Sequence, residues 1–295
     1  MIEKALYEHL ISQADLAAVL TTYNEEPAIF NMKAPADTDT GWAGGPQYGR
    51  IVFDVDLQGD PARCFGGTLM VDIMCEEDDP FLEDIERLTR SLIHGYFFSN
   101  GTFTVAAQWR TSNRFQEPDN HVIGYTASFE LLGFPVLTTF APDVIERINE
   151  FCGAFENLHI INHDALPATA WKPTGDESAV YWRLVQETPS PWYPDTYATI
   201  WRTATIKGHI FSRDNATAAA VARDIATRLL TAKRLKKPGE QSIMIGKRAP
   251  SIDYGADPLR TGQITVEGTY GILRHYVNEK TVDHIKYTEK REETP

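Results

Sequence analysis

The stretch of sequence that decides the fold is Asp79-Pro80-Phe81-Leu82-Glu83-Asp84-Ile85-Glu86-Arg87-Leu88-Thr89-Arg90-Ser91-Leu92 (79–92). Its apolar residues recur at the three- and four-residue spacing of one helix face, which predicts an amphipathic helix. A second helix is predicted about 138 residues later, where Asp214 precedes Ala218, Val221, Ile225 and Leu229. Two strands are predicted after each helix, so the order of elements is repeated.

The match extends to single positions on both sides of these helices. At an offset of 137, Leu69, Ile73, Leu88 and Leu92 correspond to Ile206, Ile210, Ile225 and Leu229; at 138, Gly101 and Arg110 correspond to Gly239 and Arg248. In the last strand, Tyr125, Ala127 and Leu131 match Ile264, Val266 and Tyr270 at an offset of 139. An offset of 138 there would turn each side chain to the opposite sheet face. We interpret the pattern as a duplication with single-residue insertions in turns.

The repeat predicts an α+β fold made of two tandem related domains. Each copy has the pattern helix, strand, strand, helix, strand, strand, and we expect a mainly antiparallel sheet of about four strands covered by two helices. The first helices are predicted at residues 2–20 and after Pro142. The expected domains are residues 1–139 and 140–295, the latter a more divergent copy ending in a charged tail from Tyr276 to Pro295.

Charge distinguishes the two copies sharply. Residues 1–139 carry 21 acidic and 8 basic side chains and residues 140–295 carry 20 of each, which together give 41 acids, 28 bases and a net charge of −13. The first copy is therefore a poor candidate for binding nucleic acid, because that affinity comes mainly from Lys and Arg at phosphates. An acidic surface is instead suited to line a passage through which DNA slides without sticking.

The cysteines and the chain start indicate a protein made in a reducing compartment. Cys64, Cys75 and Cys152 are an odd number without CxxC spacing, so we expect buried free thiols rather than disulfides or a zinc site. The first residues lack the apolar run of a signal peptide, and the chain contains no apolar stretch long enough to span a membrane. We expect no membrane association and assembly in the cytoplasm.

Candidate sites for chemistry are weak. The sequence contains no GxSxG, HExxH, GxxxxGK[ST] or GxGxxG motif, so we expect no enzyme activity, no catalytic residue, no cofactor and no metal. His159, His163 and Asp164 have the spacing of a helical metal site, but Ile160 and Ile161 favour an extended segment. The acidic run 76–79 and the basic cluster of Lys233, Arg234, Lys236 and Lys237 lie at predicted helix ends whose dipole each complements.

The segment Thr40-Gly41-Trp42-Ala43-Gly44-Gly45-Pro46-Gln47-Tyr48-Gly49 belongs to a long irregular loop, from Tyr23 to Gly49, that allows two interpretations. Such loops are often functional, so Trp42 could contact a ligand or a partner. Alternatively, Trp42 folds back onto its own domain. The sequence leaves both open.

The first copy resembles the tail completion family of bacteriophages, which includes tail terminators and tail-to-head joining proteins. The resemblance lies in the opening helix at 2–20, the irregular loop, the segment Pro46-Gln47-Tyr48-Gly49-Arg50-Ile51-Val52-Phe53 leading into the first strand, and the order of later elements. It covers about 130 residues and includes no catalytic motif.

This resemblance implies a structural virion protein of the tail or neck. It would act as part of a homo-oligomeric ring that caps the tail tube, ends its polymerisation and joins it to the head connector, with DNA passing through the lumen without specific binding. Two copies per chain leave open a pseudo-hexamer of three chains or a stack of two rings made by six chains; the unequal charge favours stacking. The alternatives are a two-module protein-binding adaptor that uses the Trp42 loop, or an enzyme without a recognisable motif.

Overall fold

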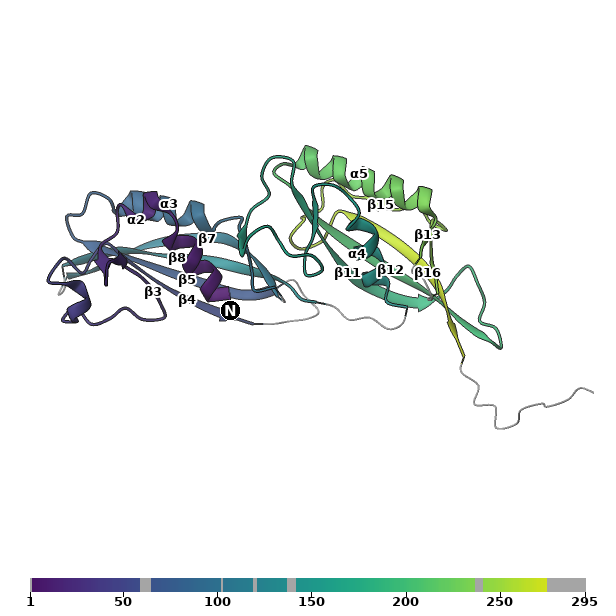
Figure 1. Cartoon of the computed structure of the whole chain (residues 1–295), viewed down its shortest axis with the longest axis horizontal. Helices are drawn as coiled ribbons and strands as arrows, with labels where there is room; N and C mark the ends of the chain where they lie inside the picture. Colours follow the sequence, from purple (N-terminus) through teal and green to yellow (C-terminus); the bar gives the residue numbers. More distant parts are fainter. Residues whose placement is uncertain are drawn as a thin grey trace, which may run out of the picture.

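The structure is a computed structural model that describes residues 2–58, 65–101, 103–118, 121–136, 142–236 and 241–274 (Figure 1). Its helices are α1 (Ile2–Ile11), α2 (Ala14–Ala17), α3 (Leu82–Ile93), α4 (Val144–Cys152) and α5 (Asn215–Ala232), with a 3₁₀ turn, η1 (Thr40–Trp42). In the first half the strands are β1 (Thr22–Tyr23), β2 (Glu26–Pro27), β3 (Ile29–Asn31), β4 (Arg50–Leu57), β5 (Phe65–Glu76), β6 (Phe97–Ser99), β7 (Thr104–Glu117) and β8 (Val122–Phe134). The second half contains β9 (Leu158–Ile160), β10 (Ala170–Trp171), β11 (Ser178–Pro189), β12 (Thr199–Phe211), β13 (Arg234–Leu235), β14 (Ile243–Ile245), β15 (Ser251–Ile252) and β16 (Ile264–Leu273).

The expected α+β fold with about four strands and two helices per copy is wrong. Strands hold 41% of the described residues and helices 22%, and these residues form two seven-stranded sheets, each curled into half a barrel. The strands that the sequence did not indicate, such as β3, β6, β9 and β13, are two or three residues long. A strand of that length has no detectable alternation of apolar and polar residues.

Six strands of each sheet follow the same order. The first runs β10-β6-β7-β8-β5-β4-β3, and the second runs β13-β14-β16-β12-β11-β9 with β15 also paired to β16. Each sheet has a parallel pair at one edge, β3 with β4 and β9 with β11, followed by antiparallel pairs. Strands β6, β7, β8, β5, β4 and β3 therefore occupy the places of β13, β14, β16, β12, β11 and β9.

The strand registers identify equivalent residues in the two halves. Leu69 lies opposite Phe129, and Ile206 lies opposite Val266. If Leu69 corresponds to Ile206, Phe129 corresponds to Val266 at the same offset of 137. The offset of 139 expected for the last strand is therefore wrong by two residues, although it assigns the correct sheet face.

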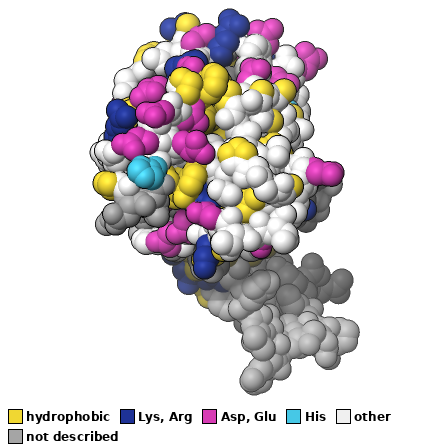
Figure 2. Space-filling view, turned by 90° about the vertical axis from the view of Figure 1, so that its left-hand side faces the viewer, with side chains coloured by type: hydrophobic (Ala, Val, Ile, Leu, Met, Phe, Trp, Pro, Cys, Tyr) yellow, Lys and Arg dark blue, Asp and Glu magenta, His cyan; other side chains and the backbone are white. Residues whose placement is uncertain are grey.

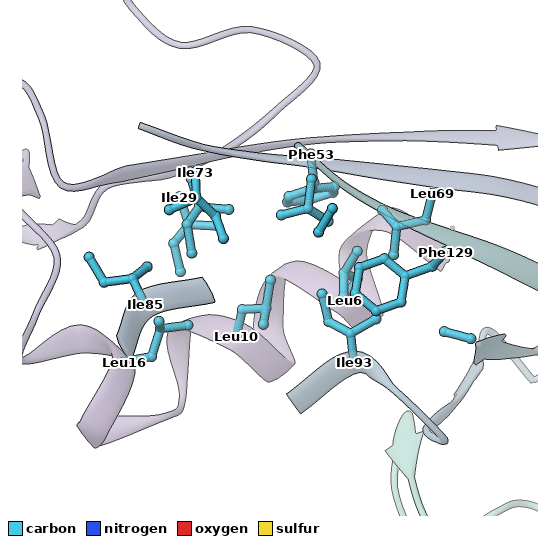
Figure 3. Packing of buried hydrophobic residues seen from close by; sticks show 14 of the residues in the cluster. Leu6, Leu10, Leu16, Ile29, Phe53, Leu69, Ile73, Ile85, Ile93 and Phe129 are labelled. Atoms are coloured by element: carbon cyan, nitrogen blue, oxygen red, sulfur yellow. The ribbon is translucent and has the colours of Figure 1, made fainter. Parts of the chain in front are cut away.

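Helices cover one face of each sheet and bury its core. In the first half, α1, α2 and α3 pack against the face that carries Phe53, Leu69, Ile73 and Phe129, all buried (Figure 3). The helix expected at 2–20 is divided into α1 and α2, because Gln13 adopts an extended conformation. Complete burial of side chains such as Leu6 and Leu10 stabilises this layer by about 2 kcal/mol each.

The second core is built in the same way with different helix lengths. Helices α4 and α5 cover the face of the second sheet that carries Val180, Trp182, Ile206 and Ile210. Asp143 accepts hydrogen bonds from the backbone N–H groups of Ile145 and Glu146, and Asp214 accepts one from Thr217. These two aspartates are N-caps. Each α-helix of the second half therefore begins directly after its capping aspartate.

Candidate interaction surfaces

The two sheets are joined through the edge of the first. Strand β10 comes from the second half but pairs with β6, so that Trp171 lies opposite Phe97 and Ala170 lies opposite Phe98. An edge strand offers unpaired backbone groups to any suitable segment. Here a segment of the same chain takes that place, in the middle of the long axis of the molecule (Figure 1).

An aromatic cluster buries the contact between the halves. The Phe211 ring lies 4.8 Å from Phe97 and 5.3 Å from Phe134, and the Tyr181 ring lies 5.2 Å from Phe134. All four side chains are buried, together with Trp171. Aromatic pairs at such distances contribute about 0.5 to 1.5 kcal/mol each beyond their buried area.

Polar contacts around the cluster fix the orientation of the halves. Tyr181 donates a hydrogen bond to the Pro135 carbonyl at 2.9 Å, and Thr104 donates one to the side-chain oxygen of Asn162 at 3.0 Å. The Asn162 amide in turn donates to the Phe134 carbonyl. On the helix-free side, Arg260 of the second half contacts Glu130 of the first at 2.6 Å.

Sequence reasoning missed this contact, although one signal for it was present. The registers equate Ile51 with Val180, and Trp42 and Trp171 each stand nine residues before these strand positions. The same registers equate Ile29 with Ile160, and therefore Asn31 with Asn162. A shared tryptophan and a shared asparagine in two otherwise dissimilar loops could have marked these segments as the ones that contact a neighbour.

Trp42 itself is packed inside its own half. The side chain is 3% exposed, lies 5.0 Å from the Tyr23 ring and 5.8 Å from the Phe30 ring, and donates from Nε1 to the Ala36 carbonyl. Of the two interpretations of this loop, the structure therefore favours Trp42 folding back onto its domain. An adaptor that uses the Trp42 indole as its contact surface is not compatible with this burial.

The acidic run at the end of β5 lies on an acidic end of the first half (Figure 2). Helix α3 begins at Leu82, later than expected, because Asp79 first accepts a hydrogen bond from the Phe81 N–H in a turn. Glu77 contacts Gln116 at 2.7 Å, and with Glu76, Asp78 and His121 it lines an open pocket of about 320 Å³. Nearby, a hydrogen bond from Arg50 lowers the pKa of Asp37.

The basic cluster lies at the opposite end of the molecule, beside the edge strand β13 (Figure 1). Lys233, Arg234 and Lys236 are exposed there, and Lys233 ends α5 in a left-handed conformation. Lys237, Gly239 and the expected tail at 276–295 lie outside the described residues. The two clusters of opposite charge therefore occupy the two ends of the long axis.

The histidines considered as metal ligands lie in and after a strand. His159 belongs to β9, with its ring 5.8 Å from Trp171, whereas His163 and Asp164 are exposed in the following turn. Within the described residues, no group of three or more His, Cys, Asp or Glu side chains is arranged to hold a metal ion.

Two of the three cysteines are buried thiols. Burial raises the pKa of Cys75 and that of Cys152 to about 12. Cys64 lies outside the described residues. Because the thiolate is the reactive form, Cys75 and Cys152 are poorly suited to nucleophilic or redox chemistry.

We expect a C64S variant to react with a thiol reagent about 10³-fold more slowly in the folded state than in guanidinium chloride, since a pKa of about 12 lowers the thiolate fraction by roughly that factor relative to an unfolded cysteine. The measurement is the rate of colour release from a disulfide reagent at pH 8. Fast labelling of the folded protein would contradict the burial of both thiols.

No helix in the described ranges is long and apolar enough to cross a membrane. Comparison with models of known protein families found no match, and comparison with curated proteins found none either.

Proposed function

We propose that this protein is a structural component of a tailed phage virion, which acts in a ring to cap the tail tube, end its polymerisation and join it to the head connector. The observation that carries the proposal is the joining, through a sheet edge, of two sheets that share six strands in the same order. This construction suits a protein whose task is to hold neighbouring copies of one fold in a fixed relation. The sequence resemblance of the first copy supports the same assignment.

The helix-free face of the first sheet suits a passage for DNA. Along β4 and β5, Asp54, Asp56 and Asp72 alternate with core residues and therefore lie on the face away from the helices. Carboxylates repel the phosphate backbone, and a face of this charge lets DNA pass without binding. In the proposed ring this face lines the lumen.

Unequal surfaces of the two copies account for termination. A protein ends polymerisation when one side reproduces the contacts of the tube subunit and the other side offers no site for the next tube ring. Two copies with one architecture and different charges meet this requirement, because each can contact a different neighbour. The proposed partners are accordingly the tail tube protein and the head-tail connector.

The proposal is tested with purified full-length protein and isolated tail tubes. Light scattering and negative-stain microscopy should reveal rings, formed by the protein alone or at the ends of tubes. Addition of the protein to polymerising tube subunits should shorten the mean tube length. A protein that stays monomeric and leaves tube length unchanged would contradict the proposed function.

A further inference from the structure

Among the described residues no strand pairs with the outer side of β13, and an open pocket lies at this edge of the second sheet, at the place where the first sheet binds β10. The strand registers identify four pairs of equivalent residues, the first of each pair in the first sheet and the second in the second sheet: Phe97 and Arg234, Thr104 and Ser242, Ala106 and Met244, Phe134 and Gly271. The four first-half residues contact β10, Asn162 or the aromatic cluster. Their four counterparts line one pocket of about 320 Å³, with Thr199, Trp201, Gln241 and Leu273. We call this the edge pocket.

The first half carries the counterpart of the segment that fills this place within the chain. Asn31 and Trp42 correspond to Asn162 and Trp171, the two residues that contact the first sheet. Although Trp42 is buried, Asn31 is exposed and Met32 is 73% exposed, more than most large apolar side chains of the described residues. We call residues 30–42 the docking loop; it lies at the end of the molecule farthest from β13 (Figure 1).

Charge and apolar surface are complementary between these two ends. The docking loop carries the exposed Asp37, Asp39 and Lys33, with Asp37 paired to Arg50. Figure 2 shows many carboxylates on this end of the molecule. The edge pocket is flanked by Lys233, Arg234 and Lys236, all exposed. Its floor offers Met244, Trp201 and the 56%-exposed Leu273 to an apolar side chain such as Met32.

We propose that the docking loop of one chain binds the edge pocket of a second copy of this chain, so that copies associate head to tail. The inference rests on the proposed ring function and names the surfaces that build the ring. In this contact Asn31 accepts a hydrogen bond from Ser242, as Asn162 does from Thr104 within the chain. The Met32 side chain packs against Met244, Trp201 and Leu273 of the edge pocket. A contact of this kind joins two different surfaces, and it closes into a ring when the rotation between chains allows it.

The residue replacements indicate that the contact between chains is weaker than the contact within a chain. Phe97 and Phe134, which belong to the buried aromatic cluster, are replaced in the edge pocket by Arg234 and Gly271. Ion pairs at an exposed contact contribute about 0 to 1 kcal/mol each and weaken with salt. The contact within the chain is thus permanent, whereas association between chains is reversible and sensitive to ionic strength.

Two variants of the full chain separate this contact from other modes of association. M32K places a cation on the docking loop opposite the basic edge, and S242W fills the edge pocket. Each variant retains one intact surface, so each alone should be monomeric by mass photometry, whereas a 1:1 mixture should form heterodimers through the intact loop of S242W and the intact pocket of M32K. F81K, which changes an exposed apolar residue at the start of α3, is the matched control and should assemble like the wild type.

Outcomes of this experiment distinguish the contact from the ring function itself. If either single variant forms wild-type rings, or if the mixture stays monomeric while the wild type assembles, the head-to-tail contact is overturned and the ring function stands. A wild-type protein that never associates, alone or on tubes, overturns both. Circular dichroism and thermal melts of both variants confirm that loss of assembly does not come from unfolding.

Discussion

Replacement of Trp171 by alanine is expected to lower the free energy of unfolding by about 3 to 5 kcal/mol and to divide thermal unfolding into two transitions. The indole is buried at 5% exposure, its ring lies 5.8 Å from Phe97, and its backbone pairs with β6. Truncation leaves a cavity in the buried aromatic cluster that joins the two halves. The halves then lose their mutual stabilisation and unfold separately.

Differential scanning calorimetry of the W171A variant and of W192A measures this effect. Trp192 is 44% exposed in the turn between β11 and β12, so W192A should change stability by less than about 1 kcal/mol. If W171A unfolds in one transition at the wild-type temperature, the aromatic cluster does not couple the halves.

A second large effect is expected from His209, which is buried beside the contact between the halves. Its Nδ1–H donates to the Pro258 carbonyl at 2.7 Å, and its ring lies 5.8 Å from Tyr181. Burial, and to a smaller extent the charges of Arg183 and Lys207, lower the pKa of His209 to about 4 against the opposing effects of the Pro258 hydrogen bond and of Asp257. The folded protein therefore holds this imidazole neutral.

The sign of the pH dependence follows from the two pKa values. In the unfolded chain His209 has a pKa near the ordinary 6.5, so between pH 6.5 and about 4 the unfolded state binds the proton that the folded state excludes. Stability conferred by the neutral form is complete above pH 6.5 and declines as the pH falls through this window. Between pH 7 and pH 5 the loss is about 2 kcal/mol.

Urea unfolding of the wild type and of H209Q at pH 7, 6 and 5 measures this loss. Carboxylates and the other histidines titrate in both proteins, so the difference between the two pH profiles isolates His209. We expect the H209Q profile to be flatter by about 2 kcal/mol over this range. Parallel profiles would show that His209 is protonated, or exposed, in the folded state.

The long elements of the fold were predictable from the sequence, and the short ones were not. The periodicity of 79–92 and of 214–229 indicated α3 and α5, although Asp79 delays the start of the first. Strands β5 and β12 are long enough for alternation to be detected, whereas β6 and β13 are not. The short strands complete the seven-stranded sheets, and because they were not detected, the expected number of strands per sheet was only about four.

The contact between the halves depends on interactions that local patterns do not encode. Trp171 and Phe97 are 74 positions apart, and nothing in the residues around either one specifies the other as its partner. Comparison of equivalent positions, Trp42 with Trp171 and Asn31 with Asn162, would have indicated the segment but not the strand it binds. Tertiary packing decides that choice, because it requires both sheets to be formed.

Strand β10 also sets the order in which the chain can mature during synthesis. The first sheet ends at Phe134, yet the backbone that covers its β6 edge is made only when Ala170 and Trp171 are translated. Until then the β6 edge of a nearly complete half-barrel has no partner from the second half, and uncovered edges of this kind promote association between nascent chains. While the thirty-odd residues between β8 and β10 are being translated, the nascent first half is therefore prone to aggregate through its β6 edge. This period ends when β10 pairs with β6.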